Sequence, residues 1–350
     1  MFLNRKIAAP LTLWAAFALA GHTLQAQSYE LSGDRVAIYN LAGEVTLEAG
    51  SGSQVVVEVT FRGDDAGQLR IETGAVRGRE TLRVIYPGDR VVYPARGDSR
   101  TQLRVRDDGT FSDGGHDYGA RVRISSSGDG LEAYADIKIR VPSGQTLDVY
   151  LAVGEISASN VSGDLRLDTH SAPVTTTGTR GSLLVDVGSG SVSVSDAEGD
   201  VDIDTGSGSV EATGIRGDVL RIDTGSGRVT TSDISVTQLS IDTGSGGVEV
   251  GNAIARDIMV DTGSGSVRVE LMADARDIEI DTGSGSVTLS VPEGFGAEIE
   301  IETGSGSIDL DFPLQVRRFE RTSITGTMGD GNGRVTIDTG SGNIRIRKSG

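Results

Sequence analysis

The 350-residue sequence contains no cysteine. Disulfide bonds and thiolate metal sites are therefore excluded, and no thiol is present to carry a lipid anchor. The chain is stabilised without covalent cross-links, even in a compartment that would permit them.

Tryptophan and histidine are scarce as well. The only tryptophan is Trp14, and the three histidines are His22, His116 and His170. Trp14 and His22 fall in an N-terminal segment that resembles a removable leader, so a mature chain would keep two histidines and no tryptophan. This leaves little material for histidine-based metal binding or acid–base chemistry.

Residues 1–26 have the pattern of a secretory signal peptide. Arg5 and Lys6 precede an apolar run, and the segment ends in the small residue Ala26. Pro10 interrupts the run, which is shorter than the ~20 residues that a spanning helix needs. We expect cleavage after Ala26, export to the periplasm, cell surface or medium, and no transmembrane segment in the mature chain.

The chain has fewer positively charged than negatively charged residues. The chain has 32 Lys and Arg against 50 Asp and Glu, a formal net charge of −18 that becomes −20 without Arg5 and Lys6. Such a surface repels nucleic acid and anionic lipid. We therefore expect no nucleic-acid partner.

One five-residue motif, Asp-Thr-Gly-Ser-Gly, recurs through the C-terminal half at a nearly constant interval. The last interval is almost twice as long as the others, which leaves room for one divergent turn. The copies begin at Asp204, Asp223, Asp242, Asp261, Asp281 and Asp338, with a Glu-Thr-Gly-Ser-Gly version at Glu302. Related segments begin upstream at Asp186, Asp168, Tyr150 ("YLAVGEI") and Tyr39 ("YNLAGEV").

Apolar residues alternate with polar ones on both sides of each motif, which indicates strands. An odd number of positions separates Ile203 from Val210, which flank one copy, so a straight strand would point them to opposite faces. If both face one core, the chain must turn between them, and glycine permits the positive φ that such a corner requires. The predicted turn glycines are Gly206, Gly208, Gly225, Gly227, Gly244, Gly246, Gly263, Gly265, Gly283, Gly285, Gly304, Gly306, Gly340 and Gly342.

A single unit with two short strands cannot bury its apolar face alone, whereas many such units can do so by stacking. The predicted fold is all-β, a parallel β-solenoid of ~18–21-residue coils; an antiparallel sandwich is the alternative, but it gives no reason for the regular spacing. We predict a signal peptide at 1–26, an N-terminal β region at 27–145 and a repeat array at 146–350. Residues 87–130 break the period and are expected to form a long loop or hairpin insertion.

Asp-Thr-Gly-Ser also opens the active-site loop of pepsin-like aspartic proteases. Their mechanism needs two carboxylates that share a proton across facing lobes, whereas copies in one row would all point the same way. We therefore expect no protease activity. Instead, each aspartate, such as Asp204, is expected to accept hydrogen bonds from backbone N–H groups near Gly206 and Ser207 and so hold the corner.

A row of carboxylates also raises the question of a bound cation. Neighbours ~4.8 Å apart repel by roughly 1 kcal/mol per pair in water, and calcium prefers oxygen ligands. In calcium-loaded β-rolls, however, the aspartate follows the glycines, whereas here it precedes them. We therefore expect no cofactor. Calcium is the alternative, with candidate ligands Asp204, Asp223, Asp242, Asp261, Asp281, Glu302 and Asp338.

A carbohydrate-active enzyme is a further alternative, because polysaccharide lyases and hydrolases also use β-helices. Their grooves offer aromatic platforms beside carboxylates, and this chain has few aromatics. Any such site would lie within 87–130, where Tyr93, His116, Asp117 and Tyr118 occur; a solvated loop is the simpler interpretation.

Two segments, "DIKIRVPSGQTLDVYLAVGEISASNVSGDLRLDTHSAPVTTTGTRGSL" and "ITGTMGDGNGRVTIDTGSGNIRIRK", resemble the bacterial family known as domain of unknown function 4097. Its members are described as adhesin-like proteins with β-strand repeats. The resemblance implies a β-helix-like stack, also called a toast-rack, in exported or envelope-associated proteins, and it implies no catalytic residues. This chain differs from the usual pattern in the uniformity of its Asp-Thr-Gly-Ser-Gly copies.

Together these observations predict an exported, non-enzymatic β-solenoid that serves as an adhesin or as an interaction scaffold in the cell envelope. Its expected partner is an envelope protein or a surface glycan. The alternatives are a carbohydrate-active β-helix enzyme and a calcium-stabilised surface module.

Overall fold

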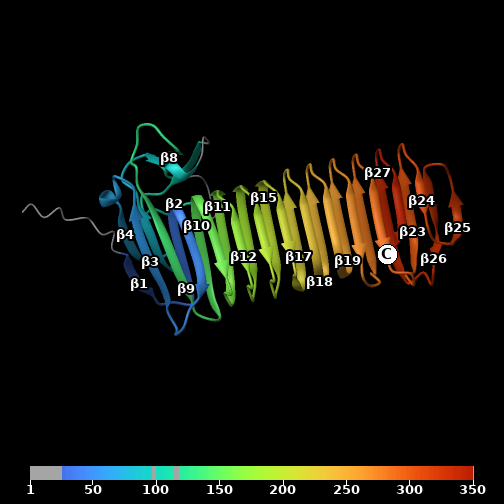
Figure 1. Ribbon diagram of the computed structural model, residues 1–350, viewed down its shortest axis with the longest axis horizontal. Coiled ribbons are helices and arrows are strands. Elements are labelled where there is room, and N and C mark those ends of the chain that lie inside the picture. The colour runs from blue at the N-terminus through green and yellow to red at the C-terminus, as the bar shows by residue number, and fades with distance from the viewer. Residues whose placement is uncertain (1–25, 97–99, 113–117, 350) are drawn as a thin grey trace, which may run out of the picture.

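The computed structural model describes residues 26–96, 100–112 and 118–349, and within these the chain is all-β. The strands form a long stack with a small second sheet beside its N-terminal end (Figure 1). Two short 3-10 helices, η1 (Ala66–Gln68) and η2 (Pro94–Arg96), interrupt the strands. No helix in the described part of the chain is long and apolar enough to cross a membrane. The predicted signal peptide, apart from Ala26, lies outside the described residues.

The central part of the stack consists of repeat units that pair in parallel. Each unit contributes a strand before the motif and a strand after it, and both strands pair with their counterparts in the next unit along the chain. The strands are β10 (Gln145–Ser159), β11 (Gly163–Ser171), β12 (Val174–Thr177), β13 (Leu183–Ser189), β14 (Val192–Ser195), β15 (Val201–Ser207), β16 (Val210–Thr213), β17 (Arg216–Thr224), β18 (Val229–Thr243), β19 (Val248–Thr262), β20 (Val267–Leu271), β21 (Asp277–Thr282) and β22 (Val287–Val291).

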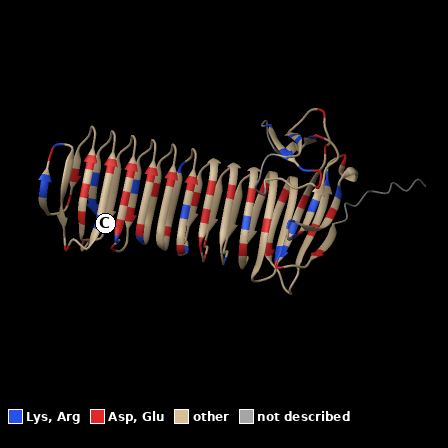
Figure 2. Cartoon of the chain, turned by 180° about the vertical axis from the view of Figure 1, so that it is seen from behind, with Lys and Arg blue, Asp and Glu red and all other residues tan. Residues whose placement is uncertain are grey.

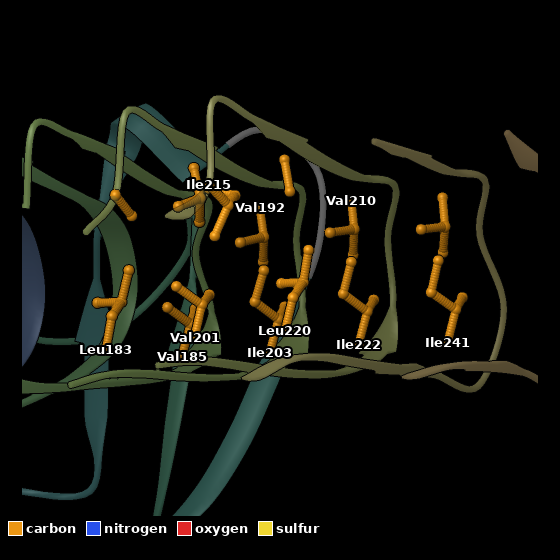
Figure 3. Close-up of a cluster of buried hydrophobic side chains, with 14 of the residues drawn as sticks. Leu183, Val185, Val192, Val201, Ile203, Val210, Ile215, Leu220, Ile222 and Ile241 are labelled. Atoms are coloured by element: carbon orange, nitrogen blue, oxygen red, sulfur yellow. The ribbon is translucent and has the colours of Figure 1, made fainter. Parts of the chain in front are cut away.

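The predicted corner is confirmed. Ile203 and Val210 are both buried in one continuous core, and Figure 3 shows Val210 and Ile222 approaching each other from opposite sides of this core. Val, Ile and Leu at every second position fill this core along the stack. Because each unit exposes the top and bottom of its own apolar layer, the units are stable only in contact with one another.

Antiparallel strands close the N-terminal end, so the sheet is mixed rather than wholly parallel. β2 pairs in parallel with β10 on one side and with β5 and β9 on the other, and β1, β3 and β4 add antiparallel strands. Tyr39 in β2 is the register partner of Tyr150, which confirms that the two segments are related units. These strands are β1 (Gln27–Leu31), β2 (Arg35–Ala49), β3 (Val55–Arg62), β4 (Arg70–Val76), β5 (Arg79–Ile85) and β9 (Tyr134–Val141).

The order of the units at the C-terminal end differs from their order in the sequence. The unit of Asp338 pairs on one side with the unit of Asp281 and on the other with the unit of Glu302. The expected divergent turn is wrong: the residues between Glu302 and Asp338 add two strands that close the stack in antiparallel pairing. The strands here are β23 (Ala297–Thr303), β24 (Ile308–Leu310), β25 (Leu314–Phe319), β26 (Ser323–Met328), β27 (Gly333–Thr339) and β28 (Ile344–Lys348).

The segment 87–130 is not only a loop. It contains a three-stranded sheet of β6 (Arg90–Val92), β7 (Thr101–Val105) and β8 (Ala120–Ser125), in which β7 and β8 form the antiparallel pair that a hairpin requires. This insertion sheet packs on the outer face of β2 and β10, and its Phe111 joins Tyr39 and Tyr150 in a second buried cluster. The expected hairpin is therefore present, and the solvated-loop interpretation of the cluster is wrong for Tyr93, which is buried.

Candidate functional site

The register of the units places the carboxylates of successive units in one continuous line along the outside of the stack, here called the acidic row. Adjacent members are direct register partners on neighbouring strands, about 4.8 Å apart in a β-sheet. Figure 2 shows acidic residues on successive strands of the stack. In spatial order the row is Asp168, Asp186, Asp204, Asp223, Asp242, Asp261, Asp281, Asp338 and Glu302.

The aspartates of the motif do not hold the corner. Asp204 is exposed and points away from the core, and in the described residues no backbone N–H of its turn donates to its carboxylate. The turn is held instead by backbone hydrogen bonds between units, such as Gly208 N–H to Ser226 O (3.0 Å) and Gly225 N–H to Thr205 O (3.0 Å). The predicted capping role of the aspartate is therefore wrong, and its carboxylate is available to solvent.

The two glycines of each motif are required mainly by the neighbouring unit. A Cβ on Gly208 would lie 1.9 Å from Gly190 O, and a Cβ on Gly206 would lie 2.7 Å from Gly188 O. In this copy only the second glycine has a positive φ, +155° at Gly208, whereas Gly206 does not. The prediction that both supply positive φ is thus half right: the first glycine serves close approach between units.

The motif threonine is a structural residue that our sequence reasoning missed. Thr205 is fully buried, and its counterparts in the other copies are buried as well. Later in the stack the hydroxyl donates to the second glycine of a neighbouring unit, as from Thr282 to Gly265 O (3.1 Å) and from Thr303 to Gly342 O (2.9 Å). The alternation Val201, Ile203, Thr205 is the sequence signal that could have identified it.

Electrostatics along the acidic row follow from burial and from the neighbours. Partial burial first, and then the charges of flanking aspartates, raise the pKa of Asp204 and of Asp242. At the N-terminal end of the row Asp168 is buried, and desolvation raises its pKa to about 6, although Arg166 donates to it at 3.1 Å. At these three positions, burial and neighbouring carboxylates therefore disfavour the charged form.

The carboxylates of the acidic row do not converge on a single site. Among the described residues, no group of three or more His, Cys, Asp or Glu side chains is arranged to hold a metal ion. The calcium candidates lie side by side in a line, one from each unit, so each would need further oxygen ligands from solvent or from a partner.

A separate hollow of about 340 Å³ lies where the insertion sheet meets the first units. Glu44 and Glu155 line it as register partners on adjacent strands. Tyr93 is 5% exposed, and burial followed by the charges of nearby acidic groups, Glu44 among them, raises its pKa to about 12. Ala95, Gly154, Ser171 and Pro173 complete the lining.

Of the candidate cluster in the insertion, the described member Tyr93 lines this hollow and the described member Tyr118 does not. Tyr118 is 73% exposed, and positions 116 and 117 lie outside the described residues. The glutamates were missed, yet the shared Gly-Glu in "YNLAGEV" and "YLAVGEI" is a signal that places both at the same point of two related units.

Comparison with known proteins identifies a family. No curated protein matches the chain. A crystal structure of a "putative cell adhesion protein" from Clostridium sporogenes ATCC 15579 is 9% identical; the match covers 93% of this chain and 100% of that chain, with a TM-score of 0.21. That score is too low to bear on fold or function. The profile of the family described as Toastrack DUF4097 matches residues 133–347, more than half of the chain. The chain therefore belongs to the toastrack DUF4097 family.

Proposed function

We propose that this protein is an exported, non-enzymatic β-solenoid that acts as an adhesin-like binding scaffold in the cell envelope. The observation that carries the proposal is the acidic row, in which identical groups recur at the spacing of the strands. Membership of the toastrack family and the parallel pairing of the units support the same function.

The acidic row is suited to contact with an extended partner. Its side chains are exposed or partly exposed from Asp186 onward, and rigid strands fix their spacing. Many weak contacts along one rigid surface add up when the partner presents matching groups at several points. Negative charge favours a partner region that is positively charged, and it makes the association rate sensitive to salt.

Charge-matched variants test this function. The triple substitution Asp204→Asn, Asp223→Asn, Asp242→Asn neutralises the centre of the row. The matched control Glu211→Gln, Glu249→Gln, Glu270→Gln removes the same amount of charge from the strands that follow the turn. We expect the first variant to bind isolated cell envelopes at least tenfold more weakly than the unaltered chain and the second to bind normally. Equal binding by all three proteins would contradict a role for the row.

Export is tested separately by cell fractionation. The full chain should appear in the periplasmic, outer-membrane or medium fraction, with the mature N-terminus at Gln27. A protein that stays in the cytoplasm with residues 1–26 intact would contradict the proposal.

The hollow at the insertion sheet favours a surface glycan as a second kind of partner. Two adjacent carboxylates, Glu44 and Glu155, lie beside the ring of Tyr93, and sugar sites combine such polar groups with an aromatic side chain. Glycan-array binding that is lost in Glu155→Gln and Tyr93→Ala, but kept in Tyr118→Ala, would support it. Release of new reducing ends from a bound polysaccharide would instead support a carbohydrate-active enzyme.

A further inference from the structure

The unit that contains β27 and β28, residues 333–348 and here called the C-terminal unit, occupies a slot between two units that are consecutive in the sequence. β27 pairs with β21 on one side and with β23 on the other, and β28 pairs with β22 and β24. In Figure 1, β27 precedes β23 and β24 along the stack. The walls of the slot are therefore residues 277–291 and 297–310.

Repeat spacing alone does not require this arrangement. The interval from Asp281 to Glu302 is close to the interval between other units that pair directly. If the two walls paired with each other, Asp277, Glu279 and Asp281 would lie opposite Glu298, Glu300 and Glu302, as their shared register partners in β27 show. Like charges directly opposite one another destabilise a sheet.

Charge explains the slot. The wall 277–291 has a formal charge of −3, the wall 297–310 has −4, and the C-terminal unit has +3. Arg334 lies in register between Asp277 and Glu298, Arg345 pairs with Asp309 at 3.1 Å, and Lys348 pairs with Glu293 at 3.0 Å. The slot thus selects a basic unit in a chain that is otherwise strongly acidic.

Contacts inside the slot are the same as those between other units. A Cβ on Gly340 would lie 2.6 Å from Gly283 O, and a Cβ on Gly263 would lie 2.6 Å from Gly244 O. Thr339 donates to Gly285 O at 3.1 Å, as Thr282 does to Gly265 O. None of these contacts depends on which molecule supplies the unit.

We propose that two copies of this chain exchange their C-terminal units, so that residues 333–348 of each copy occupy the slot of the other. The segment 329–332, which contains Gly329 (φ +57°) and Gly331 (φ +72°), is the hinge. All contacts within the slot are kept in the exchanged dimer and only the hinge changes, which is the condition under which such exchange has a low cost. The resulting two-fold dimer joins two stacks at their C-terminal ends and doubles the number of acidic rows.

The absence of cysteine allows a direct test. Glu279 and Thr336 are register partners across the slot, and Ser240 and Met259 are register partners between units that follow one another in the chain. Parallel register partners are close enough for a disulfide. The singly substituted mature chains Glu279→Cys and Thr336→Cys are unfolded together, refolded at high concentration and oxidised; Ser240→Cys and Met259→Cys are treated in the same way as the control.

We expect a mixed disulfide dimer from the first mixture, at least fivefold more abundant than from the control mixture. The two double variants, Glu279→Cys/Thr336→Cys and Ser240→Cys/Met259→Cys, should each form the disulfide and so verify the folded register. If both double variants form their disulfides and the two mixtures give equal amounts of dimer, the proposal is overturned.

Hinge length gives an independent measurement. Deletion of Asp330 and Gly331 hinders closure within one chain, and shortened hinges favour exchange. The dimer fraction measured by light scattering after refolding should rise at least fivefold relative to the unaltered chain. A shortened chain that retains its strand spectrum and remains monomeric would also overturn the proposal.

Discussion

Tyr39 and Tyr150 stack face to face, with ring centroids 4.5 Å apart and ring planes 4° from parallel. They are register partners, and Tyr150 is in turn the partner of Asp168, the first member of the acidic row. Where the row would continue, aromatic rings therefore replace carboxylates. This replacement gives the insertion sheet an apolar surface on which to pack.

Substitution Tyr150→Ala should release the insertion sheet. It removes the stacked ring and the hydroxyl that accepts from Arg79 at 3.0 Å, with an expected loss of about 3–5 kcal/mol in the stability of this region. The readouts are the rate of trypsin cleavage within the arginine-rich insertion and denaturant unfolding. Tyr118→Ala, at an exposed position, is the control and should leave both unchanged; equal cleavage of the two variants would count against this role of the stack.

Substitution Gly208→Ala should destabilise the whole stack. The new methyl group would meet the carbonyl oxygen of Gly190 at 1.9 Å, and the positive φ disfavours alanine. We expect a loss of about 3 kcal/mol or more in the free energy of unfolding, measured in urea, because neither backbone can move without breaking its ladder. Ser207→Ala, at the exposed neighbour, should change stability by less than about 0.5 kcal/mol.

Threonine-to-valine substitutions should have different effects at the same position of two copies of the motif. The Thr282 hydroxyl donates to Gly265 O, whereas the Thr224 hydroxyl is buried and has no hydrogen-bond partner among the described residues. Thr282→Val should cost about 1 kcal/mol, and Thr224→Val should be neutral or stabilising, because burying an unpaired hydroxyl is unfavourable. Unfolding midpoints of the two variants measure this difference, and an equal loss of stability in both would contradict the prediction.

The local sequence pattern was sufficient to predict much of the fold. Alternation around each motif predicted the strands, and the odd spacing of Ile203 and Val210 predicted the corner between them. Both signals are local, since they depend on a side chain facing the core of its own unit. The acidic row follows from the same pattern once the units pair in register.

The order of the units could not be predicted from the motif, because near-identical units pair equally well with any neighbour. The relevant signal was charge: the unit of Asp338 is basic, while the units of Asp281 and Glu302 are acidic. A hairpin was expected in the insertion, but its packing on the stack was missed, because the packing surface is formed by Tyr39 and Tyr150, which are far apart in the chain.

Stability should depend on pH through Asp168. Burial raises its pKa to about 6, from 3.8 for an ordinary aspartate, so between these values the folded chain keeps a proton that the unfolded chain has released. Stability therefore falls as pH rises from about 4 to 6. Asp168→Asn should remove this fall and gain on the order of 2 kcal/mol at pH 7 relative to the unaltered chain. Urea unfolding at several pH values measures it, and the exposed variant Asp274→Asn should keep the original dependence.

Neutralising Asp223 should reduce the electrostatic repulsion on the neighbouring carboxylates on both sides of it in the acidic row. Asp223 lies between Asp204 and Asp242, and its charge contributes to the raised pKa of each. In Asp223→Asn both pKa values should fall, as followed by carboxyl carbon NMR, with a gain in stability below about 1 kcal/mol because the groups are exposed to solvent.

Calcium should have no specific effect on this row. Each unit contributes one carboxylate to a line, and no three acidic groups converge in the described part of the chain, so calcium should act by screening alone. After EDTA treatment, calcium chloride and sodium chloride at equal ionic strength should then raise the melting temperature equally, and Asp223→Asn should reduce both gains. A larger gain with millimolar calcium that disappears in Asp223→Asn would instead identify the row as a calcium site.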